Sequence, residues 1–75
     1  MNNDIFNHLM ERLLSKADDA LNTYQKDKSN EFYSGRVEAY YEVLDALKSE
    51  LTVWDYDLGQ CGLDFDLDRK YMIGK

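Results

Sequence analysis

The chain has 75 residues, of which 44% are hydrophobic and none is proline, and its formal net charge is −6. A chain this short forms at most one domain, residues 1–75, and its apolar content excludes a disordered linker. Its negative charge repels phosphate backbones and anionic lipid, so we expect no direct nucleic-acid binding and no membrane binding.

The first predicted element is a helix over about residues 4–26. Its apolar residues recur at alternating steps of four and three, which is helical spacing. These residues are Phe6, Met10, Leu13, Ala17, Ala20 and Tyr24. Asn2, Asn3 or Asp4 can accept hydrogen bonds from the free N–H groups of the first turn. The polar stretch QKDKSN, residues 25–30, predicts the connection that follows.

The second predicted element is a helix over about residues 30–58. Ser29 or Asn30 is its expected N-cap, and Gly59 is expected to end it. Its apolar residues again recur at alternating steps of four and three, over four heptads. They are Tyr33, Val37, Tyr40, Leu44, Leu47, Leu51, Trp54 and Leu58.

Two apolar-striped helices joined by a short polar connection predict an all-α fold, an antiparallel two-helix hairpin over residues 4–58. At about 1.5 Å per residue, the second helix is longer than the first by roughly 9 Å. Its end, with Trp54 and Leu58, should therefore extend beyond its neighbour. Tyr41 and Val43 also flank its apolar stripe, which makes that face too broad for one neighbouring helix to cover.

The C-terminal tail, residues 59–75, shows a different pattern. Apolar residues alternate with polar ones, which predicts an extended segment with one apolar side. They are Leu63, Phe65, Leu67, Tyr71 and Ile73. Such a tail can lie across its own hairpin or against a second chain. Because an unpaired extended segment exposes backbone hydrogen-bonding groups, we expect a homodimer in which two tails pair.

The predicted interface consists of aromatic and apolar residues in the overhang and the tail. Tyrosine and tryptophan favour interfaces because they bury a large area while keeping a polar tip. The predicted interface residues are Tyr41, Trp54, Tyr56, Leu58, Leu63, Phe65, Leu67 and Tyr71.

Acidic residues are concentrated in the second half of the chain. Between Glu38 and Asp68 there are nine acidic residues and a single basic one, Lys48. Such a surface suits a basic protein partner, but it also serves solubility alone. The stripe Glu31, Glu38, Glu42 and Asp45 could imitate the phosphates of a nucleic acid.

The tail carries part of a calcium-loop pattern. Asp64, Asp66 and Asp68 fit the first three ligand positions of an EF-hand loop. The loop then needs a glycine for its turn and a glutamate at its last position, where this chain has Arg69 and Lys75. We therefore expect no metal site.

Catalytic motifs are absent from the sequence. His8 is the single histidine, and Cys61 lies in acidic surroundings that disfavour a reactive thiolate. We expect no catalytic residue, no cofactor and no enzymatic activity. A lone cysteine is typical of a reducing compartment, and the chain has neither a signal-peptide pattern nor a long apolar run, so we expect a cytoplasmic protein.

The central stretch FYSGRVEAYYEVLDALKSEL resembles helical segments of small uncharacterised accessory proteins of Gram-positive phages and conjugative elements. The resemblance covers about a third of the chain and implies a role through protein contacts in the bacterial cytoplasm; it carries over no functional residue. We expect a non-enzymatic protein-interaction module that self-associates and binds an unidentified protein partner. The alternative is an acidic nucleic-acid mimic that inhibits a DNA-binding protein.

Overall fold

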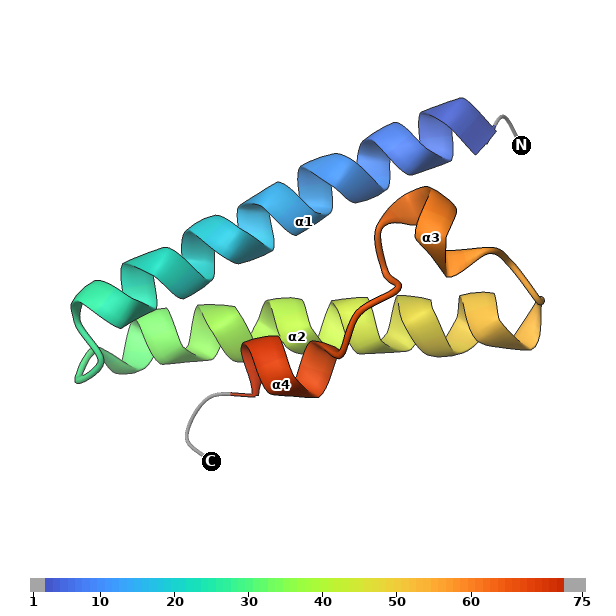
Figure 1. Ribbon diagram of the computed structural model, residues 1–75. Helices are drawn as coiled ribbons and strands as arrows, with labels where there is room; N and C mark the ends of the chain where they lie inside the picture. Colours follow the sequence, from blue (N-terminus) through green and yellow to red (C-terminus); the bar gives the residue numbers. More distant parts are fainter. Residues whose placement is uncertain (1–2, 73–75) are drawn as a thin grey trace.

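The computed structural model describes residues 3–72 and is all-helical over that range, with no strand (Figure 1). Two long helices, α1 (Asn3–Lys26) and α2 (Glu31–Val53), pack against each other as an antiparallel hairpin. Two short helices follow, α3 (Leu58–Cys61) and α4 (Leu67–Tyr71). The predicted all-α hairpin is confirmed, whereas Asn2 and Ile73 lie outside the described residues.

The connection between α1 and α2 is closed by local hydrogen bonds. The Asn30 side-chain oxygen accepts from the backbone N–H groups of Phe32 and Tyr33, at 2.9 and 3.2 Å. Asn30 is therefore the N-cap of α2, one of the two caps predicted. Ser29 instead donates its hydroxyl to Asp27 at 2.8 Å, which stabilises the turn.

The second helix ends earlier than predicted. It stops at Val53, and the expected rod to Leu58 is wrong, because Asp55 adopts a left-handed conformation with φ of 58°. Aspartate tolerates this conformation better than most residues. The Asp57 carboxylate then accepts from the N–H of Gly59 at 3.0 Å and caps α3. Leu58 consequently begins a new helix instead of extending α2.

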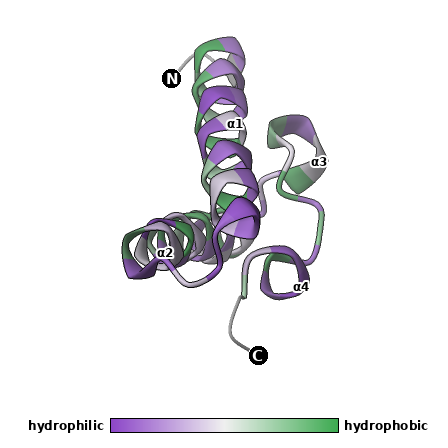
Figure 2. Cartoon of the chain, turned by 90° about the vertical axis from the view of Figure 1, so that its left-hand side faces the viewer, coloured by the Kyte–Doolittle hydropathy of each residue, from purple (hydrophilic) through white to green (hydrophobic). Residues whose placement is uncertain are grey.

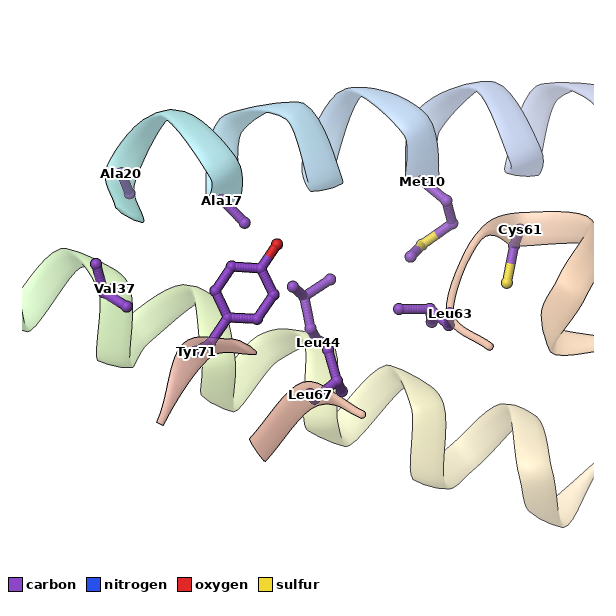
Figure 3. Packing of buried hydrophobic residues seen from close by; sticks show 9 residues of the cluster. All are labelled: Met10, Ala17, Ala20, Val37, Leu44, Cys61, Leu63, Leu67 and Tyr71. Atoms are coloured by element: carbon purple, nitrogen blue, oxygen red, sulfur yellow. The ribbon is translucent and has the colours of Figure 1, made fainter. Parts of the chain in front are cut away.

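The tail is also different from the extended ribbon predicted for it. Leu63, Leu67 and Tyr71 are spaced by four residues, and the last two belong to α4, which is capped by Asp66. All three side chains are at most 3% exposed in a core that also contains Leu44 (Figure 3). Of the two arrangements considered for the tail, it covers its own hairpin.

Further contacts fix the tail on α1 and α2. Lys48 of α2 donates its ammonium group to the backbone carbonyl of Phe65, and the Tyr41 hydroxyl donates to Asp68. The Tyr71 hydroxyl reaches α1 and donates to the Asp18 carboxylate at 2.6 Å (Figure 3). The tail is thus held by polar contacts at its edges and by apolar packing at its centre.

Gly62 provides a test of this arrangement. Its φ of 82° is strained for any other residue, and an added Cβ would lie 3.0 Å from Leu14 Cδ1. Gly62→Ala should therefore lower the free energy of unfolding by about 1–2 kcal/mol. In the matched control Gly35→Ala, which has no atom within 4 Å of the new Cβ, a helical alanine should raise it by about 0.5–1 kcal/mol. Urea titrations followed by circular dichroism measure both, and equal effects would contradict the fold described for residues 61–63.

Candidate interaction surface

The hairpin has two unlike sides. Figure 2 shows α3 and α4 together on one side of the α1–α2 pair. On α1, that side is marked by Asn7, which accepts from the Tyr56 hydroxyl at 2.9 Å, and by Asp18, which accepts from Tyr71. On α2 it is marked by Tyr41 and Lys48. The opposite side of the hairpin carries neither α3 nor α4.

We call this opposite side the open face. The helical register places its residues about half a turn from those that contact the tail. On α1 it contains Ile5, Leu9, Arg12, Lys16 and Asp19. On α2 and its C-cap it contains Phe32, Arg36, Val43, Glu50 and Trp54.

The apolar side chains of the open face are largely exposed. Trp54 and Phe32 are 75% and 71% exposed, and Leu9 and Ile5 are 59% and 58% exposed. Figure 2 colours the same helices by hydropathy and shows hydrophobic and hydrophilic segments along both α1 and α2. A concentration of exposed apolar side chains on one side of a small protein is typical of an interaction surface.

The charges of the open face oppose the charge of the whole chain. It carries Arg12, Lys16 and Arg36 against the acids Asp19 and Glu50, a balance of +1 in a chain of −6. The Glu50 carboxylate accepts from the Trp54 indole N–H at 3.1 Å. Across residues 3–72, the ion pair that forms joins Lys70 to Asp18 on the other side of the hairpin, and none involves the three open-face cations.

Acidic groups gather on the tail side instead. Asp45 of α2 and Asp66 and Asp68 of the tail line one surface hollow of about 490 Å³, together with Lys48. The hydrogen bond from the Tyr41 hydroxyl to Asp68 is the main reason why the pKa of Tyr41 rises to about 12. Asp66 is engaged as the cap of α4. Asp66 and Asp68 thus stabilise the tail.

A second hollow, of about 440 Å³, lies between the N-terminal half of α1 and α3. His8, Glu11 and Cys61 are among its lining residues. Cys61 is 4% exposed and donates its thiol to the carbonyl of Leu58 at 3.5 Å, so it is part of the core. Within residues 3–72, His, Cys, Asp and Glu side chains form no group of three or more that could hold a metal ion.

Of the predicted interface residues, the structure places only Trp54 on the open face. Leu63, Leu67 and Tyr71, which were predicted at an interface, are instead buried in the core of the single chain. Leu58 and Phe65 are partly buried against that core. Their burial follows from the folding back of the tail.

The two remaining tyrosines lie on the tail side. Tyr56, a predicted interface residue, is half-buried; its ring packs edge-on against Phe6 with centroids 5.6 Å apart. Tyr41 is half-buried beside Asp68. Sequence reasoning missed Ile5, Leu9 and Phe32, although the spacing of Ile5 and Leu9 by one helical turn was a usable signal.

No protein-family model, curated protein or solved structure matches the chain. In the part of the chain that the structure describes, every helix is too short or too polar to cross a lipid bilayer.

Proposed function

We propose that this chain is a non-enzymatic protein-interaction module that works through its open face, where it self-associates and binds a second, unidentified protein. The observation that supports this most directly is the exposure of Ile5, Leu9 and Trp54 at one end of the open face, with Phe32 also exposed near the turn at its other end. Burial of apolar area is the main driving force of protein association, and tryptophan is enriched among the residues that dominate binding energy.

The position of the tail supports the choice of surface. Its apolar residues Leu63, Leu67 and Tyr71 are already buried within one chain, so no second copy is required to cover them. The proposed homodimer therefore joins two open faces. It replaces the homodimer through paired tails that the sequence suggested. A dimer of this kind leaves the core of each chain intact.

Self-association is tested by sedimentation equilibrium over a range of about 1 to 500 µM, where weak dimers form. The mass of the wild-type chain should rise with concentration toward that of two chains. Leu9→Glu should keep the chain monomeric, because it places a charge in the apolar contact, while Asn22→Glu, an equal charge change at an exposed α1 position off the open face, should not. A wild-type mass that stays at one chain throughout would refute self-association.

A second candidate function rests on a different surface. The exposed carboxylates of Glu38, Glu42, Asp45 and Asp68 on the tail side would let the chain imitate nucleic-acid phosphates and inhibit a basic DNA-binding protein. Binding of that kind should depend on these carboxylates and weaken steeply with salt. It should be indifferent to Leu9→Glu, which separates the two functions.

A further inference from the structure

The α1 part of the open face combines two kinds of side chain in one line. Ile5, Leu9, Arg12 and Lys16 follow one another at steps of four, three and four, so they occupy one face over about three helical turns. The first two are apolar and exposed, and the other two are exposed cations. The next step of three reaches the exposed acid Asp19, at the end of the line.

Arg12 and Lys16 also repel each other. Like charges one helical turn apart destabilise an isolated helix, and neither cation here has an ion-pair partner within residues 3–72. Arg36 adds a third unpaired cation from α2. A ligand with negative groups at these positions would remove the repulsion and gain attraction at the same time.

We infer that the preferred occupant of the open face is an amphipathic helix of another protein, with an apolar stripe flanked by acidic side chains. This inference rests on the proposed function and specifies its partner. The stripe of such a helix would pack on Ile5, Leu9 and Trp54, in the manner of helix-in-groove recognition. Its acidic flanks would face Arg12, Lys16 and Arg36.

The same charges limit the alternative occupants. A symmetric dimer through the open face brings together two surfaces with a balance of +1 each, so self-association is weak and an acidic helix displaces it. An anionic bilayer, like an acidic amphipathic helix, combines apolar and negatively charged groups. However, its extended negative surface repels the whole chain, whose net charge is −6. Charge complementarity therefore favours a helix, which covers the open face alone.

Trp54 supplies the readout, because it is the only tryptophan in the chain and lies on the open face. Three synthetic helical peptides share one leucine stripe and carry glutamate, lysine or serine on its flanks. Titrated into dilute chain, the glutamate peptide should shift Trp54 emission to shorter wavelengths and bind at least about tenfold more tightly than the lysine peptide. Added salt should weaken this binding.

Matched variants identify the groups responsible. Arg12→Glu combined with Lys16→Glu should weaken binding of the glutamate peptide by at least about tenfold. The control pair Lys28→Glu and Arg69→Glu changes the net charge equally, at a hollow on the tail side, and should change the affinity by less than about twofold. Circular dichroism of both double variants checks that the fold is retained.

The remaining outcomes overturn the inference in distinguishable ways. Equal binding of the glutamate and lysine peptides would overturn the acidic partner and leave the proposed function standing. Binding of no peptide, with a mass that still rises with concentration, would assign the open face to a second copy. Binding of no peptide and a constant monomer mass would overturn both proposals. A shift of Trp54 emission with phosphatidylglycerol vesicles, but with no peptide, would assign it to lipid.

Discussion

Tyr71→Ala should lower the free energy of unfolding by about 3–5 kcal/mol, the usual cost of removing a buried aromatic ring. Tyr71 is fully buried between α1 and α2, and its hydroxyl donates to Asp18 at 2.6 Å. A core in a chain this small supplies about 3–5 kcal/mol in all, so the variant should be largely unfolded. Circular dichroism at neutral pH measures this loss of helix.

Tyr71→Phe separates packing from hydrogen bonding. It keeps the ring and removes the bond to the Asp18 carboxylate, at an expected cost of about 1–2 kcal/mol. An equal effect of the alanine and phenylalanine variants would contradict the burial of the ring. A phenylalanine variant as stable as the wild type would contradict the bond.

The same pair of residues sets an expected pH dependence. Burial and the hydrogen bond to Asp18 raise the pKa of Tyr71 above its ordinary value of 10.0. Because Tyr71 holds its proton more tightly in the folded chain, it contributes fully to the free energy of unfolding below about pH 10. This contribution is lost as the pH rises further. The difference in stability between wild type and Tyr71→Phe should therefore shrink above pH 10.

At low pH the stability contribution of Asp18 depends on pH in the opposite direction. Partial burial opposes the charged form of Asp18, but hydrogen bonds from Tyr71 and Lys70 and the charge of Lys70 outweigh it and lower its pKa below 3.8. Its contribution is present above about pH 4 and is lost as the pH falls through the folded-state pKa. Urea titrations at several pH values check both limbs, and a difference between the two proteins that is independent of pH would contradict the account.

Leu44→Ala has the second large expected effect, a loss of about 2–5 kcal/mol. Leu44 is fully buried at the centre of the core, beside Tyr71 and Leu67 (Figure 3). The adjacent Val43 is 48% exposed on the open face and serves as the control, since Val43→Ala should change stability by no more than about 0.5 kcal/mol. Similar losses in the two variants, measured by urea titration, would show that the faces of α2 are wrongly assigned.

Much of the hairpin could be predicted from the sequence because its signals are long and local. The apolar spacing predicted α1 nearly to its ends, and Asn30 was among the predicted caps. The end of α2 was missed because Trp54 and Leu58 continue the apolar spacing beyond Val53, where the helix ends. Apolar periodicity is insensitive to a turn that preserves the spacing: Leu58 still packs against the core after the turn, whereas Trp54 at the helix end is exposed.

The tail could not be predicted for a related reason. Leu63, Phe65 and Leu67 alternate as in a strand, while Leu63, Leu67 and Tyr71 recur every four residues as in a helix. So short a segment fits both periods, and packing against α2 decides between them. The open face escaped prediction in turn, because which side of the hairpin remains uncovered depends on where the tail packs.

If the tail covers one side of the hairpin, association should involve the open face and leave the tail undisturbed. Amide NMR spectra of the dilute and concentrated chain test this most directly, because each residue reports separately whether association changes its surroundings. We expect the amide signals of Ile5, Leu9, Val43 and Trp54 to shift with concentration and those of residues 63–71 to stay unchanged. Shifts concentrated in residues 63–71, with the open face unaffected, would contradict this expectation.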